Sequence, residues 1–247
     1  MVSYHTASYR TIPHDTVWYH TTHLLAEQMI VLIGGEKGGT GKTTLATNLA
    51  ARRSAEGATV MLVDTDKQGS ASYWAAIREE VGSLNRVSCV QVFGKSVTSQ
   101  VADLAEHYDE LIIDAGGRDS TELRSAMVIA DRLFIPVQAS QFDVWTIERM
   151  DELVGQAQGI NAALEAAVVI NRASPHPQVR ESDQAREILE EHENLQFSGV
   201  VVHDRIAFRR AASEGMSVWE METPDAKACA EIDALYNAIY TSEVRHA

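Results

Sequence analysis

The feature that most constrains this chain is a short apolar strand that leads directly into a glycine-rich turn. The segment Met29–Ile33 has the composition of a buried strand, and the run Gly38-Gly39-Thr40-Gly41-Lys42-Thr43-Thr44 follows it. Glycines let backbone amides turn toward phosphate oxygens, and a helix beginning near Lys42 adds the positive end of its dipole. We expect Lys42 to bridge the β- and γ-phosphates and the Thr43 hydroxyl to ligate Mg²⁺. The sequence therefore predicts a nucleoside triphosphate site.

One position of this loop departs from the usual phosphate-binding pattern. The pattern places a glycine five residues before Gly41, and Glu36 stands there instead. A chance glycine turn is the alternative interpretation. The order of the segments argues against chance, because the glycines and Lys42 follow an apolar strand and open a predicted helix, which is the arrangement that phosphate binding requires.

Apolar segments alternate with helical segments along the rest of the chain. Alternation of this kind implies parallel strands joined by right-handed crossovers. We therefore predict an α/β fold of the P-loop NTPase kind: a single doubly wound, mostly parallel sheet with helices on both faces. The predicted strands are rich in Val and Ile and cover Ile30–Ile33, Thr59–Val63, Val87–Phe93, Leu111–Ile113, Leu133–Val137, Ala167–Ile170 and Val200–Val202. The predicted helices cover Lys42–Glu56, Ser70–Glu80, Ser96–Tyr108, Thr121–Ala130, Val144–Gln158, Gln178–His192, Ile206–Glu214 and Ala226–Val244.

Residues 1–28 differ in composition from everything that follows them. They are rich in Tyr, His and Thr and show neither the period of a strand nor that of a helix. We interpret them as a disordered extension, or as a mis-called start with Met29 as the biological first residue. No linker or repeat interrupts the later sequence, so we expect one domain over residues 29–247.

Four motifs, in the same order along the chain, resemble those of the ParA/MinD family of ATPases. The glycine loop carries a second lysine, Lys37, as the family's deviant Walker A motif does. The segment Val60–Ser70 resembles the family's second motif, although Lys67 replaces the usual proline. The segment Leu111–Asp114 resembles a Walker B strand, although Ala-Gly-Gly-Arg follows it in place of Thr-Pro-Pro. The segment Val169–Arg172 resembles the strand whose asparagine contacts the base.

The resemblance covers about residues 29–220 and implies a role for each matching side chain. It implies a catalytic set of Lys37, Lys42 and Asp66, in which Lys37 reaches the nucleotide of a dimer partner and Asp66 orients or deprotonates the attacking water. The implied Mg²⁺ ligands are Thr43, Asp64 and Asp114, with Asp114 acting through water. A solvated loop or helix-capping aspartate is the alternative for each carboxylate. The implied nucleotide-binding residues are Lys37, Gly38, Gly39, Thr40, Gly41, Lys42, Thr43, Thr44, Asn171 and Arg172. Asn171 is equally explained as a plain turn residue.

The resemblance to small ParA-like proteins also implies a biological role. ATP, bound with Mg²⁺, drives homodimerisation, the dimer binds DNA without sequence preference, and a ParB-like or other adaptor stimulates hydrolysis. Such a protein positions or partitions a plasmid, a chromosome or another cargo. It is cytoplasmic and associates with the nucleoid when ATP is bound. Two isolated cysteines, Cys89 and Cys229, agree with a reducing compartment.

The charge of the chain restricts how it could bind DNA. Lys and Arg number 21 and Asp and Glu number 35, which gives a net charge of −14. An acidic chain needs a local basic patch to bind phosphate, and dimerisation would double such a patch. The candidates are Arg205, Arg209 and Arg210 near a late predicted helix. The alternative is that these arginines form an ordinary solvated face, because Glu214 and Glu220 lie close by in the sequence.

Two other functions within the same superfamily stay open. A MinD-like ATPase that associates with the membrane needs a basic amphipathic C-terminal helix, whereas the tail here carries Glu231 and Asp233, so a membrane partner is not expected. A metabolic enzyme that uses ATP to activate a carboxylate is the other alternative, and Lys37 argues against it only in part. Binding of the wild-type protein to random duplex DNA, tested with and without ATP, separates these interpretations.

Overall fold

The central feature of the fold is one parallel sheet. The computed structural model describes residues 28–117, 119–138, 144–174 and 186–240. Within these ranges seven strands pair in the order β3-β2-β4-β1-β5-β6-β7, and every pairing is parallel. Each observed strand contains most of the residues of one predicted strand, and the strands pair in parallel as predicted. The predicted fold class is therefore confirmed. The strands are β1 (Met29–Gly35), β2 (Val60–Asp64), β3 (Ser88–Gln91), β4 (Glu110–Gly117), β5 (Arg132–Gln138), β6 (Glu165–Ala173) and β7 (Gln196–His203).

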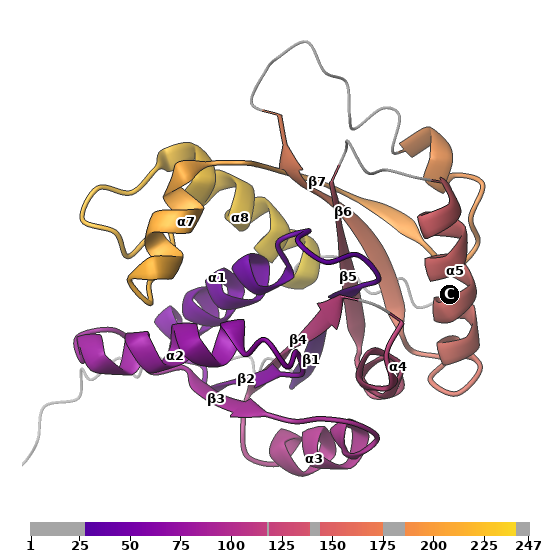
Figure 1. Cartoon of the computed structure of the whole chain (residues 1–247), viewed down its shortest axis with the longest axis horizontal. Coiled ribbons are helices and arrows are strands. Elements are labelled where there is room, and N and C mark those ends of the chain that lie inside the picture. Colours follow the sequence, from indigo (N-terminus) through magenta and orange to yellow (C-terminus); the bar gives the residue numbers. More distant parts are fainter. Residues whose placement is uncertain (1–27, 118, 139–143, 175–185, 241–247) are drawn as a thin grey trace, which may run out of the picture.

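Helices cover both faces of this sheet, as Figure 1 shows. The first face carries α1 (Lys42–Ala55), α2 (Ser70–Val81), α7 (Ile206–Ser213) and α8 (Ala226–Tyr240). The second face carries α3 (Ser96–Ala105), α4 (Thr121–Met127) and α5 (Val144–Gln158). The predicted helix at residues 178–192 lies partly outside the described residues, and residues 186–189 of it are helical. The last residues of the final predicted helix, 241–244, also lie outside.

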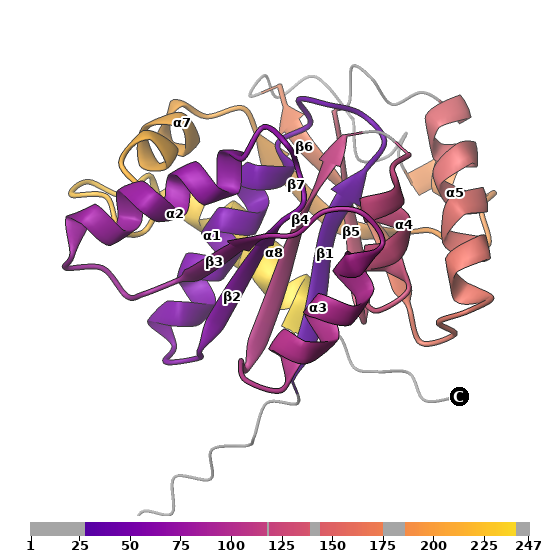
Figure 2. The same ribbon diagram turned by 60° about the horizontal axis from the view of Figure 1, so that its bottom comes forward.

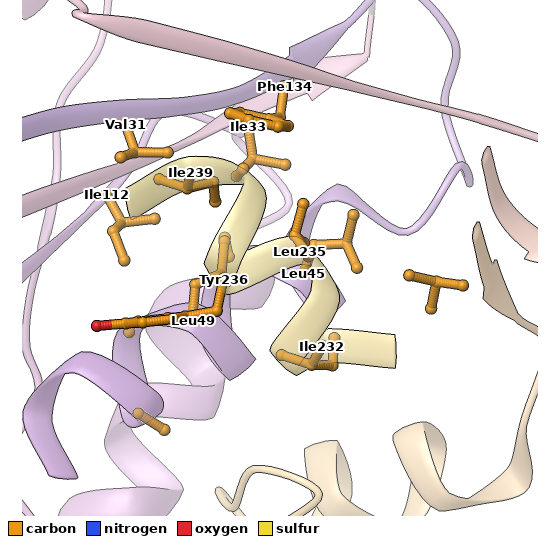
Figure 3. Packing of buried hydrophobic residues seen from close by; sticks show 14 of the residues in the cluster. Val31, Ile33, Leu45, Leu49, Ile112, Phe134, Ile232, Leu235, Tyr236 and Ile239 are labelled. Carbon is orange, nitrogen blue, oxygen red and sulfur yellow. The ribbon is translucent and has the colours of Figure 1, made fainter. Parts of the chain in front are cut away.

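The consecutive apolar residues of each strand divide between two hydrophobic cores, because successive side chains point to opposite faces. In β1, Val31 and Ile33 join the core under α1 and α8, whereas Leu32 joins the core under α4 and α5. Figure 3 shows Ile239 of α8 beside Val31 and Ile33 of β1, and Leu235 of α8 beside Leu45 of α1. The sheet is thus apolar on both faces. Polar side chains that could bind a ligand are therefore expected near the ends of its strands.

Two helices end three residues earlier than their sequence pattern predicts. The pattern extends α3 to Tyr108 and α4 to Ala130, and both predicted ends are wrong. At α4 the amide of Asp131, which would continue the helical ladder to Met127, donates instead to the carbonyl oxygen of Ile30 at 2.9 Å. The amide of Asn161 donates to the carbonyl oxygens of Met127 at 3.2 Å and Ala130 at 2.7 Å, so a distant side chain satisfies carbonyls left at the end of the helix.

A polar cluster closes the sheet at the amino end of β4. The carboxylate of Glu110 is fully buried, and it accepts hydrogen bonds from the Tyr240 hydroxyl at 2.7 Å and from Arg53 Nε at 3.3 Å. Arg53 also donates to the Tyr236 hydroxyl at 3.2 Å, and its guanidinium lies 4.8 Å from the centre of the Tyr240 ring. The cluster therefore ties α8 and α1 to the sheet.

The opposite end of the sheet places several loops close together. β1 lies in the middle, with β4 on one side and β5 on the other, so the connections leave it in both directions (Figure 2). Ligands in open α/β sheets bind at the carboxyl ends of strands where the winding direction changes. The glycine loop after β1, the loop after β2 and the end of β4 all meet at this position.

Candidate nucleotide site

The loop between β1 and α1 is closed by hydrogen bonds within itself. The Nζ atom of Lys42 donates to the carbonyl oxygen of Lys37 at 2.8 Å, and the Thr40 hydroxyl donates to the same oxygen at 3.4 Å. Gly41 has a φ of 89°, a left-handed conformation that favours glycine. Lys42 is buried, and this burial lowers the pKa of its ammonium group. The ammonium group is therefore already desolvated and held against the loop that should receive phosphate.

Side chains at the ends of β5 and β6 hold this loop from outside. The Asn171 amide donates to the Thr40 carbonyl at 2.7 Å, and the Arg172 guanidinium donates to the Gly39 carbonyl at 2.8 Å. Gln138, which the sequence did not single out, donates to the same Gly39 oxygen at 3.0 Å. Arg172 has a φ of 53°, the only positive φ of a non-glycine residue in the described ranges. These contacts fix the loop; contact of Asn171 and Arg172 with the nucleotide stays a prediction.

A threonine and an aspartate meet at the start of α1. The Thr43 hydroxyl donates to Oδ2 of Asp114 at 2.6 Å. The other oxygen, Oδ1, is buried and has no hydrogen-bond partner among the described residues. Burial raises the pKa of Asp114 to about 7, although the bond from Thr43 opposes this shift. A buried oxygen without a partner is rare, and Mg²⁺ binds through one or two carboxylates plus phosphate oxygens. Thr43 and Asp114 thus fit the predicted cation.

The second aspartate of the predicted metal set has other contacts. Oδ1 of Asp64 accepts from the Asp66 amide at 3.1 Å, and Oδ2 accepts from the amide of Ser72 at 2.9 Å and from its hydroxyl at 2.8 Å. Ser72 lies in the first turn of α2, so Asp64 holds the start of that helix. This arrangement matches the helix-capping alternative. Ligation of Mg²⁺ by Asp64 stays a prediction that would require these bonds to be exchanged.

Two glycines at the end of β4 allow the loops to approach one another. A Cβ added at Gly117 would lie 2.7 Å from the Gly38 nitrogen, which is closer than real side chains come. A Cβ at Gly116 would lie 3.3 Å from the Asp66 carboxyl group. These glycines stand where the resembling family has Thr-Pro-Pro. Their small size brings Asp66, the predicted water-handling residue, next to the Walker B strand.

The loops enclose an open cavity of about 1300 Å³. Predicted site residues Lys37, Lys42, Thr43 and Asp66 line it together. Asn171 contacts the loop through Thr40, at the other end of the glycine run. Helix α5 supplies a wall of the cavity that the sequence did not predict. The side chains of this wall are Trp145, Thr146 and Arg149.

Comparison with protein families identifies the domain. Residues 31–218 match the family described as the CobQ/CobB/MinD/ParA nucleotide binding domain. The chain belongs to this family. The match includes the glycine loop, the strand ends with Asp64 and Asp114, and helix α5. ATPases of the ParA and MinD branch use ATP with Mg²⁺, so the resemblance seen in the motifs is confirmed at the level of the family.

Individual relatives include proteins that position other structures in the cell. The chain is 29% identical over 210 residues to the maintenance of carboxysome distribution protein A of Halothiobacillus neapolitanus, covering 83% of this chain and 94% of that protein. It is 27% identical to the chromosome-partitioning ATPase Soj of Thermus thermophilus, covering 57% and 66%. Among solved structures, a complex of Cyanothece McdA with ATP superposes with a TM-score of 0.67 at 18% identity, covering 86% and 96%. Pyrococcus furiosus MinD gives 0.67 at 16% identity, covering 87% and 100%. These two likenesses concern the fold.

This CobQ/CobB/MinD/ParA domain has an ion-pair network beside its phosphate loop. Oε1 of Glu36 lies 3.0 Å from Nη1 of Arg149, whose Nη2 lies 3.6 Å from Oδ2 of Asp119. Arg124 pairs with the same aspartate at 2.6 Å and donates to Gln156 at 3.0 Å. The network connects the first loop position to α4 and α5. Sequence alone could not show it, because its members come from separate elements.

The three arginines proposed for DNA binding differ in their surroundings. Arg205 donates three hydrogen bonds of 2.6 to 3.1 Å to Glu231, so its charge is already paired. Arg209 lies 3.2 Å from Asp204, but its side chain is 61% exposed. Arg210 is exposed on the same helix, α7. Of the three candidates, the exposed arginines are therefore Arg209 and Arg210. No helix in the described part of the chain is long and apolar enough to cross a membrane.

Proposed function

We propose that this protein is an ATPase that dimerises when it binds ATP and positions DNA or another cargo by binding DNA without sequence preference. The partner-free buried oxygen of Asp114, beside the Thr43 hydroxyl at the phosphate loop, carries the nucleotide part of this proposal. The relatives that distribute carboxysomes and partition chromosomes support the positioning part. An adaptor protein would stimulate hydrolysis and so release the cargo. On this proposal the protein is cytoplasmic and associates with the nucleoid while it holds ATP.

The chemistry follows from the groups that line the cavity and from Asp114, which contacts Thr43 behind it. Thr43 and Asp114 would hold Mg²⁺, which neutralises charge on the β- and γ-phosphates. Lys42 donates to phosphate oxygens from its buried position, and the loop amides add further donors. The carboxylate of Asp66 reaches the cavity and orients the attacking water. Lys37 contacts the nucleotide of the dimer partner.

The DNA part of the proposal depends on α7. Its exposed arginines, Arg209 and Arg210, would be doubled by dimerisation, which concentrates positive charge on a chain of net charge −14. Binding driven by phosphate contacts releases counterions, so the affinity should fall steeply as salt rises. The affinity should not depend on base sequence, because phosphate contacts carry no sequence information.

Binding of the protein to random duplex DNA, with ATP and without it, tests this function. We expect binding only with ATP, and loss of binding when Arg209→Glu and Arg210→Glu are combined, with ATP-dependent dimerisation intact by sizing. Lys95→Glu combined with Arg186→Glu is a matched control, because it makes the same change of charge at exposed positions on elements of the other face. DNA binding that ignores ATP, or is absent in the wild type, would contradict the proposal. Equal losses of DNA binding in both double variants would show that the arginines of α7 are not the specific DNA contact.

A further inference from the structure

A carboxylate stands at the first position of the phosphate loop. Glu36 replaces the glycine of the usual pattern, its side chain is 21% exposed, and it lines the same cavity as Lys42 and Thr43. Like charges repel with an energy that grows as the dielectric falls, and a cavity wall screens less than bulk water. An uncompensated Glu36 would therefore oppose the binding of a triphosphate.

Arg149 compensates this charge. Its guanidinium approaches Glu36 at 3.0 Å from α5, and it is the only arginine among the described residues that line the cavity. Oδ2 of Asp119 lies 3.6 Å from Nη2 of the same guanidinium, and Asp119 is itself paired with Arg124. The two ends of the guanidinium thus each have an acidic partner, although 56% of the Arg149 side chain is exposed.

The pair contributes little to the stability of the fold. Exposed ion pairs typically stabilise a protein by about 0 to 1 kcal/mol. The effect on a ligand is different, because an anion bound beside the loop responds to the net charge of the pair. With Arg149 present that net charge is zero; without it, a full negative charge remains at the loop.

We propose that Arg149 is a positioning residue for nucleotide binding, which acts by neutralising Glu36 at the mouth of the cavity and holding it away from the phosphates. The proposal rests on the proposed function, since the anion is ATP. It assigns Arg149 no contact with the phosphates. The charges at positions 36 and 149 therefore offset each other. Removing both should restore the ATP affinity that is lost when Arg149 alone is removed.

A double-mutant cycle on the full chain, with Mg²⁺-ATP affinity measured by calorimetry, tests this. We expect Arg149→Ala to raise the Kd about tenfold, Glu36→Gln to lower it by up to about tenfold, and the combination of both to return it near the wild-type value. The effect should be smaller for ADP and should shrink in high salt, because it is a charge effect. Arg149→Lys, which keeps the charge, should stay within about threefold.

Arg209→Ala is the matched control, because it removes an exposed arginine from an ion pair with Asp204 at a position that does not line the cavity, and it should leave the Kd unchanged. Failure of the wild type to bind ATP would overturn the proposed function itself. If the wild type binds ATP, two results would overturn the inference alone. One is an unchanged Kd in Arg149→Ala. The other is a double variant that binds ATP as weakly as Arg149→Ala alone, which would indicate direct contact of Arg149 with phosphate.

Discussion

Strand β4 carries two buried carboxylates, Glu110 at its first residue and Asp114 toward its carboxyl end, and the two differ in what surrounds them. Burial raises the pKa of both Glu110 and Asp114 to about 7. Both oxygens of Glu110 accept hydrogen bonds, from Tyr240 and from Arg53. Asp114 accepts one, from Thr43, and its Oδ1 atom has no partner in the described part of the chain. One strand thus shows a completed polar cluster and an incomplete one.

The difference separates stability from function. A buried polar group whose partners are all present holds elements together, as Glu110 does for α1 and α8. A buried polar group that lacks a partner costs free energy and needs an explanation, which the predicted cation supplies at Asp114. Burial of Glu110 therefore serves stability, whereas burial of Asp114 serves ligand binding. Variants near Glu110 should change the free energy of unfolding, and variants near Asp114 should change the affinity for Mg²⁺-ATP.

Removing Lys42 should have the largest effect, and only on ligand binding. Lys42→Ala deletes the ammonium group that offsets the triphosphate charge, so Mg²⁺-ATP affinity should fall at least about a thousandfold, or about 4 kcal/mol. The free energy of unfolding without nucleotide should change by less than about 1 kcal/mol. Calorimetry and urea unfolding measure the two quantities. Normal ATP affinity in this variant would refute the assignment of the loop.

Removing Glu110 should give the reverse pattern. Glu110→Ala leaves the guanidinium of Arg53 and the hydroxyl of Tyr240 without their acceptor, which should cost about 3 kcal/mol of unfolding free energy. The affinity for Mg²⁺-ATP should stay within about twofold, because the cluster is at the far end of the strand. Urea unfolding followed by circular dichroism tests stability. A variant of unchanged stability would show that the cluster does not hold α8.

The pKa of Glu110 sharpens the comparison through pH. Its ordinary value is 4.5 and its folded value is about 7. Below pH 4.5 the carboxyl is protonated in both states, whereas between these values the unfolded chain releases the proton first. The free energy of unfolding should therefore fall as pH rises through this window, by about 2 kcal/mol from pH 5 to pH 8, and then level off. Glu110→Gln, which cannot ionise, should lose this contribution. An equal slope in both proteins would place the titration elsewhere.

Asp114→Asn should change the free energy of unfolding less than Glu110→Ala does, and with the opposite sign. The amide keeps an acceptor for Thr43 but carries no charge, so the nucleotide-free protein should gain about 1 kcal/mol at pH 8. The gain should shrink toward pH 5, where the wild-type carboxyl is already protonated in the folded state. Binding of Mg²⁺-ATP should weaken in the same variant. A loss of stability at pH 8 would mean that the charged form is satisfied after all.

The sheet and the phosphate loop were predictable because their signals are local. Consecutive Val and Ile residues identify strands covered on both faces, and the glycines with Lys42 and Thr43 need only their immediate neighbours to be recognised. The alignment of Asp64, Asp66 and Asp114 at one edge also follows, since carboxyl ends of parallel strands meet there.

The remaining features depend on contacts between distant segments. No sequence pattern shows that Arg149 pairs with Glu36, that Glu231 neutralises Arg205, or that Asn161 caps the end of α4. Asp64 illustrates the same limit. Its place at a strand end suggested a metal ligand, but only the fold reveals that Ser72 occupies its side chain.

No side chain fits at position 117, where an added Cβ would lie 2.7 Å from the Gly38 nitrogen and 2.8 Å from its Cα. Those neighbours are backbone atoms, so they cannot rotate aside as the end of a side chain can. A saturation library screened for ATP binding should consequently return a single amino acid there. Position 116 faces the flexible end of Asp66 and should accept alanine. Two adjacent glycines thus differ in their freedom to vary. A redesign of this site can replace Gly116 but must keep Gly117.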